Sequence, residues 1–127
     1  MNKKLTFTDR IKWMDYNGKK VLYVSYSGLT PLNKDLFYKV ADEAHQLVLD
    51  NTNGLLLIDV TNAYGDMEML NLLKKNSKIE KSLVKKEAVI GISGAKNILL
   101  QSVNMFSGIT IEPFSTMEEA LNWLTKN

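Results

Sequence analysis

The sequence predicts one α/β domain of 127 residues, in which helices alternate with strands that are largely parallel. The main observation is an unbroken apolar run, Leu55–Ile58, which stops at Asp59 and a polar loop closed by Gly65. A short apolar run between turn residues is typical of a strand buried on both faces. Residues 88–92 form a second such run, and stretches with helical periodicity flank both. Together these features indicate successive β-α units.

The N-terminal part of the chain is predicted to form a β-hairpin. Asn17-Gly18 lies between two apolar segments, and both residues tolerate the positive φ angles that a two-residue hairpin turn requires. We therefore expect antiparallel strands over residues 10–16 and 19–26. Residues 1–9 carry little pattern and are expected to be a frayed start of this single domain.

Two helices are predicted around the central strand. The first is expected from Asn33 to Asp50, because its apolar residues recur at intervals of three and four and so form one stripe. These residues are Leu36, Phe37, Val40, Ala41, Ala44, Leu47 and Val48. The second helix is expected over residues 66–83. Its inward face would consist of Met69, Leu70, Leu72, Leu73 and Ile79.

The C-terminal third continues the alternation. A helix is predicted over residues 96–106, then a strand over residues 109–111, with Pro113 at the end of the strand, where its missing N–H costs little. The final helix carries Ala120, Leu121, Trp123 and Leu124. Its start has two overlapping capping boxes, Ser115 with Glu118 or Thr116 with Glu119, and both remain open. The order β-β-α-β-α-β-α-β-α predicts a mixed, mostly parallel sheet with an antiparallel hairpin strand at one edge.

The composition excludes several classes of protein. The chain has no cysteine, so neither a disulfide framework nor thiolate metal ligation is possible. No apolar run approaches the roughly 20 residues that cross a bilayer, and the N-terminus does not resemble a signal peptide. We therefore expect a cytoplasmic protein without a transmembrane segment. A net charge of +2 does not indicate a nucleic-acid-binding protein.

Small polar residues follow the predicted strands. The carboxyl ends of parallel strands share one edge of a sheet, and each leads to a helix N-terminus. That edge is therefore receptive to anions or to an acidic or phosphorylated group of a partner. The alternative is that these hydroxyl groups are only helix caps and turn residues, which such a fold requires. The candidate partner- or ligand-binding residues at this edge are Ser27, Asp59, Thr61, Asn62, Tyr64, Asp66 and Ser93.

Five segments carry a resemblance to a known family through their order and spacing. They are residues 17–23 (NGKKVLY), 26–29 (YSGL), 57–63 (LIDVTNA), 89–94 (VIGISG) and 113–121 (PFSTMEEAL). They resemble SpoIIAA-like proteins, which belong with the STAS domains of sulfate transporters and anti-sigma-factor antagonists. The resemblance implies a small α/β domain of successive β-α units that docks on partners such as kinases and anti-sigma factors. Relatives of this branch have also been compared with CRAL-TRIO lipid-transfer domains.

The sequence departs from this family at its regulatory phosphorylation site. In the anti-sigma antagonists the strand-end Asp, which Asp59 resembles, is followed after a short loop by an Asp-Ser whose Ser is phosphorylated. Here no Ser or Thr follows Thr61 until residue 77. Asp66 or Glu68 could supply a fixed negative charge near a helix N-terminus, and Thr61 could be a substitute acceptor. The phosphorylation switch is therefore not carried over.

Two further features have ordinary explanations. Lysines at positions 74, 75, 78, 81, 85 and 86 could attract nucleic acid, an anionic membrane or an acidic partner. A solvated helix face explains them better, since no aromatic residue or arginine is interleaved. His45 is the single histidine, and no converging set of metal ligands or Ser-His-acid arrangement is evident. We therefore expect no metal site and no cofactor.

The sequence favours a non-enzymatic STAS-like module for protein interaction or regulation, which docks through the loops at the C-terminal ends of its strands. The alternative is a carrier or sensor of a small apolar or lipid-like ligand. Its pocket could be lined by Met67, Met69, Met105, Met117, Phe106 and Phe114, although methionine more commonly fills a core. A protein partner is expected and a homo-oligomer is possible. An enzyme comes third, because no nucleophile–base pair is evident.

Overall fold

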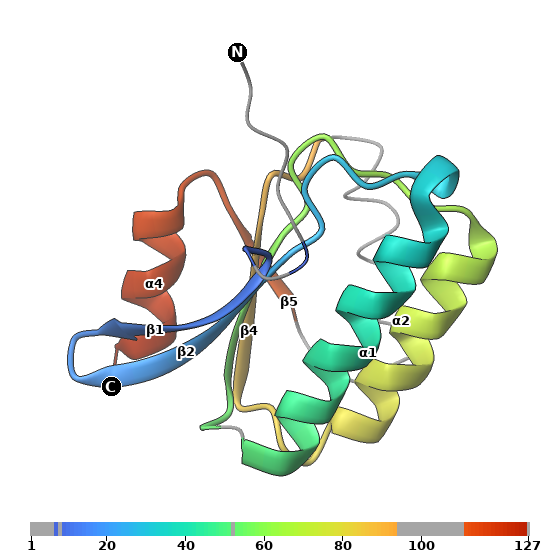
Figure 1. Cartoon of the computed structure of the whole chain (residues 1–127). Helices are drawn as coiled ribbons and strands as arrows, with labels where there is room; N and C mark the ends of the chain where they lie inside the picture. Colours follow the sequence, from blue (N-terminus) through green and yellow to red (C-terminus); the bar gives the residue numbers. More distant parts are fainter. Residues whose placement is uncertain (1–6, 8, 52, 94–110, 127) are drawn as a thin grey trace.

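The structure is a computed structural model that describes residues 7, 9–51, 53–93 and 111–126 (Figure 1). A five-stranded sheet runs in the order β1-β2-β3-β4-β5. Its strands are β1 (Ile11–Tyr16), β2 (Lys19–Ser25), β3 (Leu55–Asp59), β4 (Lys86–Ile90) and β5 (Ile111–Phe114). The β1–β2 pair is antiparallel and the other three pairs are parallel. The predicted mixed sheet with its N-terminal hairpin is confirmed.

Helices cover both faces of the sheet (Figure 1). The short 3-10 helix η1 (Pro31–Asn33) leads into α1 (Lys34–Asn51), which lies beside α2 (Met67–Glu80) on one face. The other face is covered by α4 (Met117–Thr125). The helix predicted over residues 96–106 lies outside the described residues. For the rest of the chain, the predicted order of elements is confirmed.

The β1–β2 turn follows from its two residues. Asn17 has a φ of 50° and Gly18 a φ of 75°, as a two-residue hairpin turn with the twist of the strands requires. The turn places Tyr16 opposite Lys19 and fixes the register as far as Ile11 opposite Val24. The dipeptide thereby determines which side chains of β1 face the core.

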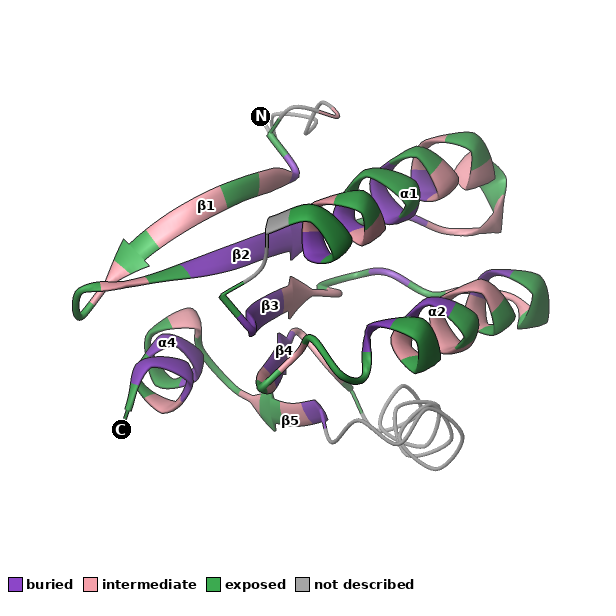
Figure 2. Cartoon of the chain, turned by 90° about the horizontal axis from the view of Figure 1, so that it is seen from below, coloured by how far each residue is buried: buried purple, intermediate pink, exposed green. Residues whose placement is uncertain are grey.

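The central strands β2 and β3 send side chains into two separate cores. Leu22, Val24 and Leu56 face α1 and α2, whereas Val21 and Leu57 face α4. Figure 2 shows the resulting burial along β2 and at the start of β3. Burying a Val or Leu side chain contributes roughly 1.5–3 kcal/mol relative to exposure, so the buried residues of these two strands contribute substantially to stability.

Three local expectations differ from the structure. β5 extends to Phe114 and includes Pro113, which is opposite Val89. Because β5 is the last strand of the sheet, a residue without an N–H is tolerated within it. Ile79, expected to face inward, is exposed, because α2 packs mainly against α1 and only part of its apolar face is covered. Met67, considered for a pocket, is likewise exposed in the first turn of α2.

Candidate functional site

The loops that follow β2, β3 and β4 meet at the C-terminal edge of the sheet. The Gly28 N–H donates to the Thr61 carbonyl at 2.9 Å, and the Val60 N–H donates to the Ile90 carbonyl at 3.0 Å. A Cβ atom at Gly91 would lie 2.4 Å from the Thr61 hydroxyl oxygen, so only glycine permits this approach. The three loops therefore form one tightly connected surface.

Asp59 holds the middle loop in place. Its Oδ1 accepts hydrogen bonds from the Thr61 N–H at 2.9 Å and the Thr61 hydroxyl at 2.7 Å. Its Oδ2 accepts a hydrogen bond from the Tyr23 hydroxyl at 3.0 Å. Burial, followed by the nearby Asp59 carboxylate, raises the pKa of Tyr23 to about 12, so Tyr23 remains a donor. The Asp59 carboxylate is thus used to order the loop.

Arg10 supports the same edge from below. Its Nη1 donates to the Ser27 carbonyl at 2.8 Å and to the Ser25 carbonyl at 3.3 Å, while its buried Nε has no hydrogen-bond partner among the described residues. Burial lowers the pKa of Arg10 from its ordinary value. Sequence reasoning missed this residue, because a charged side chain just before a strand is usually exposed.

Asp66 connects the N-terminal ends of the two neighbouring helices. It is the N-cap of α2, where its Oδ1 accepts from the Met69 N–H at 3.0 Å. Its Oδ2 lies 2.6 Å from the Lys34 ammonium of α1. The ion pair with Lys34 and then the Met69 N–H lower the pKa of Asp66. A further hydrogen bond joins the Tyr38 hydroxyl to Glu68.

Large apolar side chains are exposed at this edge. Leu32 in η1 is 94% exposed, Met67 at the start of α2 is 62% exposed, and Tyr64 in the loop between β3 and α2 is 58% exposed. The backbone bond from the Tyr64 N–H to the Leu29 carbonyl brings their segments together. We call Leu32, Tyr64 and Met67 the edge patch. Sequence analysis included Tyr64 but not Leu32 or Met67, because periodicity does not reveal which apolar residues remain uncovered.

All seven predicted site residues lie at this edge, in three different environments. Asp59 and Asp66 are occupied by hydrogen bonds within the protein. Ser27 is half-buried beside the Arg10 contact, and its N–H donates to the Ser25 hydroxyl. The exposed members, whose side chains are accessible to a partner, are Thr61, Asn62, Tyr64 and Ser93.

A cavity of about 180 Å³ lies beneath the edge, between α1, α2 and the sheet. Of the methionine and phenylalanine residues considered for a pocket, Met69 lines it. Met67 is on the surface, while Phe114 and Met117 pack with Trp123 on the opposite face of the sheet. Met105 and Phe106 lie outside the described residues. The rest of the lining comes from residues of α1, α2, the strands and the loops after them that the sequence did not indicate as pocket residues.

The lysine-rich stretch and the lone histidine belong to different parts of the structure. Lys75 and Lys78 are exposed on α2, whereas Lys86 reaches the C-terminal end of α4 and donates to the Trp123 carbonyl at 2.9 Å. His45 Nδ1 lies 2.5 Å from Glu80 Oε2, between α1 and α2. Burial raises the pKa of Glu80, although His45 opposes this.

Within the described ranges, no group of three or more His, Asp or Glu side chains is positioned to hold a metal ion. The helices described above are also too short or too polar to cross a bilayer.

A solved structure resembles this chain over nearly its whole length. It is an uncharacterised protein of the DUF3478 family from Shewanella loihica PV-4, described as having a SpoIIAA-like fold. The two structures agree with a TM-score of 0.64 over 90% of this chain and 91% of that chain, at 20% sequence identity. The chain therefore has a SpoIIAA-like fold. No protein-family model and no curated protein matches the sequence.

Proposed function

We propose that the protein is a non-enzymatic regulatory module that binds a protein partner through the edge patch and the loops around it. The observation that carries this proposal is the exposure of Leu32, Tyr64 and Met67 at the strand-end edge. The Tyr64–Leu29 backbone hydrogen bond and the Lys34–Asp66 ion pair join the segments that carry them. Exposed large apolar residues that are scattered singly need no explanation, whereas a group rimmed by polar residues is typical of an interaction site.

The surroundings of the edge patch indicate what kind of partner fits. The exposed acids Asp35 and Glu68 lie in the first turns of α1 and α2, and Asp66 lies between the two helices. Lys34 is already paired with Asp66. The rim therefore carries net negative charge. A partner segment with an apolar side chain flanked by lysine or arginine complements this surface.

The loops add hydrogen-bonding groups next to the edge patch. Thr61, Asn62 and Ser93 are exposed, and the backbone of this surface is fixed by Asp59 and by the close contact at Gly91. A rigid surface loses little conformational freedom when it binds, which favours affinity. The edge thus combines an apolar centre with a pre-ordered polar rim.

An affinity-capture experiment tests the proposal. Wild-type protein is compared with a variant that carries Leu32→Ser, Tyr64→Ser and Met67→Ser. The matched control carries Leu49→Ser, Ile79→Ser and Leu83→Ser, which replace exposed apolar residues of α1, α2 and the turn after α2. We expect to capture a partner that binds the wild type and the control equally well. Its affinity for the edge variant should be at least about tenfold lower, as is usual when apolar anchor residues are truncated. Equal capture by the edge variant would contradict the proposal.

A further inference from the structure

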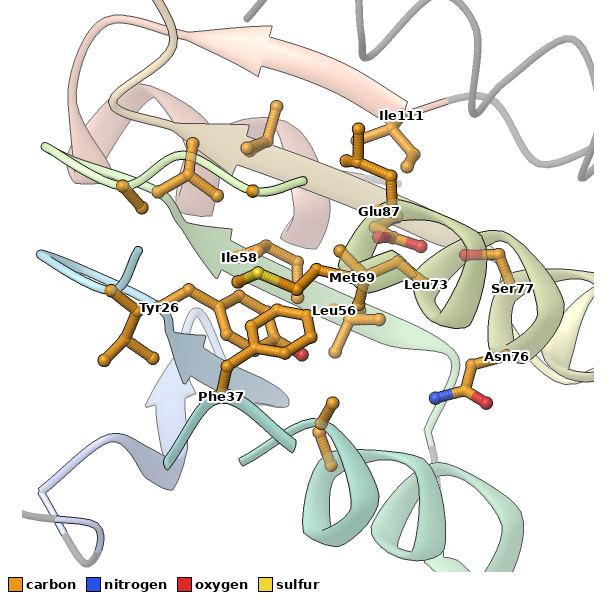
Figure 3. A pocket seen from close by; sticks show the side chains of 18 of the residues that line it. Tyr26, Phe37, Leu56, Ile58, Met69, Leu73, Asn76, Ser77, Glu87 and Ile111 are labelled. Carbon is orange, nitrogen blue, oxygen red and sulfur yellow. The ribbon is translucent and has the colours of Figure 1, made fainter. Parts of the chain in front are cut away.

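The cavity beneath the edge contains a buried acid without a partner. Glu87 of β4 is 6% exposed, and none of the described residues is hydrogen-bonded to its carboxyl group. Figure 3 shows Glu87 directed from the strand into the space that Leu73 and Ser77 of α2 also face. A buried polar group normally has a hydrogen-bond partner, so a carboxyl that faces a cavity in this way is positioned to bind a polar group that enters it.

Other polar groups line the same cavity as Glu87. Glu80 and Asn76 of α2 are buried and line the same space, as does Ser77. Glu80 is paired with His45 of α1, at 2.5 Å. The polar lining therefore offers two carboxyl groups, of which Glu80 is already paired with His45, together with the Asn76 amide and the hydroxyl groups of Ser77 and Tyr26.

The charged residues that line the cavity determine whether a cation or an anion is the better ligand. Two glutamates line the cavity, and no Lys or Arg is found among its described lining residues. An anionic ligand such as a carboxylate would add a third acid to a buried site, which costs several kcal/mol of desolvation and repulsion. A cation would neutralise Glu87 instead. Burial and the neighbouring Glu80 raise the pKa of Glu87 to about 8, as expected for a buried acid without a counter-charge.

The remaining lining is apolar and of limited size. Phe37, Leu56 and Met69 surround the part of the cavity away from Glu87 (Figure 3). A cavity of about 180 Å³ is comparable with the engineered cavity of about 150 Å³ that binds benzene. The space therefore fits one aromatic ring or a short alkyl chain together with a small polar group.

We propose that this cavity is a binding site for a small organic amine, whose ammonium group pairs with the Glu87 carboxylate and whose apolar body packs among Phe37, Leu56 and Met69. The proposal does not depend on the docking function of the edge patch. Below the pKa of Glu87, binding of the cation releases the Glu87 proton to solvent, so that the bound state holds one ammonium and one carboxylate.

Three probes of the same shape test the ligand class. They are benzylamine as the cation, benzyl alcohol as the neutral analogue and benzoate as the anion, each titrated into the full-length protein by calorimetry at pH 7.5. We expect benzylamine to bind at least about tenfold more tightly than benzyl alcohol, because it gains a buried ion pair. Benzoate is expected not to bind. Binding of benzoate equal to that of benzylamine, or no binding of any probe, would overturn the proposal.

A matched pair of variants locates the amine. Glu87→Gln keeps the size of the side chain but cannot form the carboxylate, so it should lose the preference for benzylamine over benzyl alcohol. Glu43→Gln changes an exposed glutamate of α1 and should retain that preference. An undiminished preference for benzylamine in Glu87→Gln would exclude Glu87 as the recognition group.

The pH dependence gives a test that does not require a variant to fold. The other titratable groups that line the inner part of the cavity, among the described residues, are His45 of α1, Glu80 of α2 and Tyr26 after β2, and Glu80 and Tyr26 interact electrostatically with Glu87. Because the Glu87 carboxylate fraction rises about tenfold per pH unit below a pKa of about 8 and levels off above it, benzylamine should bind the wild type roughly twentyfold more tightly at pH 8.5 than at pH 6.5. The pH dependence of benzylamine affinity measured with Glu87→Gln shows how much of the change comes from His45 and Glu80. A wild-type affinity that is flat or falls with rising pH would contradict the assignment.

Discussion

At the scale of single residues, the strand-end loops depend on a backbone contact so close that no side chain fits in it. Gly91 has a φ of 85° and lies against the backbone N and the hydroxyl of Thr61. The Thr61 hydroxyl is in turn held by Asp59. Any side chain at position 91 must displace Thr61 and with it the loop that carries the exposed polar rim.

Gly91→Ala is therefore expected to destabilise the protein by about 2 kcal/mol or more, from backbone strain together with the clash. Gly18→Ala is the matched control. It has a φ of 75°, but a Cβ there would meet no atom within 4 Å, so it should cost only about 1–2 kcal/mol of strain. Urea unfolding measures both. Equal losses would show that the Thr61 contact has no energetic role.

The sequence predicted the loop that follows Asp59, but it did not predict that Glu80 and Glu87 are buried. Asp59 directly follows an apolar run, and this position is enough to predict that its carboxylate lies at the end of the strand. Glu80 and Glu87 lie in a lysine-rich stretch, where charged residues suggest a solvated surface. The structure starts β4 at Lys86 instead of residue 88, which puts Glu87 on the same face as Val89. An error of two residues at a strand boundary thus concealed the buried acid.

At the scale of elements, the first residue of a helix can be predicted from the sequence only where a single residue is a candidate N-cap. The start of α4 offered two capping boxes, and the structure selects Thr116, whose hydroxyl oxygen accepts from the Glu119 N–H at 3.2 Å. The same hydroxyl donates to the Glu119 carboxylate at 3.0 Å. The choice depends on backbone dihedrals at the end of the β5–α4 turn, which the local sequence does not determine.

Replacing the cap should destabilise the fold selectively. Thr116→Ala is expected to lower the free energy of unfolding by about 1 kcal/mol, since the Glu119 N–H loses its acceptor. Ser115→Ala changes an exposed neighbouring hydroxyl and should have little effect. Chemical denaturation of the two variants decides between them, and a larger loss for Ser115→Ala would contradict the observed cap.

At the scale of the whole molecule, the two faces of the sheet differ in how completely they are covered. On the face beneath α4, Val21, Leu57 and Ala88 of β2, β3 and β4 belong to one apolar core. The face beneath α1 and α2 contains the cavity and the buried acids Glu80 and Glu87. The alternation of strands and helices predicted this layering. It could not predict the cavity that α1, α2 and the sheet enclose between them.

Stability should therefore fall as pH rises from about 5 to 8. The pKa of Glu87 in the folded protein is raised to about 8 and that of Glu80 is also raised, so the folded state binds more protons than the unfolded state in this window. The slope for one such group is at most about 1.4 kcal/mol per pH unit. Glu87→Gln should flatten the profile measured by denaturant unfolding. A wild-type stability that rises between pH 5 and 8 would refute the burial of these acids.

The central claim is that a protein partner binds at the strand-end edge, and photo-cross-linking tests it most directly. A photoreactive phenylalanine analogue is introduced at Tyr64 in the edge patch or, as the control, at Ile79, which is exposed in the last turn of α2. We predict a discrete cross-linked species, carrying one partner, from position 64 and none from position 79. Cross-linking of that partner from position 79 and not from position 64 would contradict the claim.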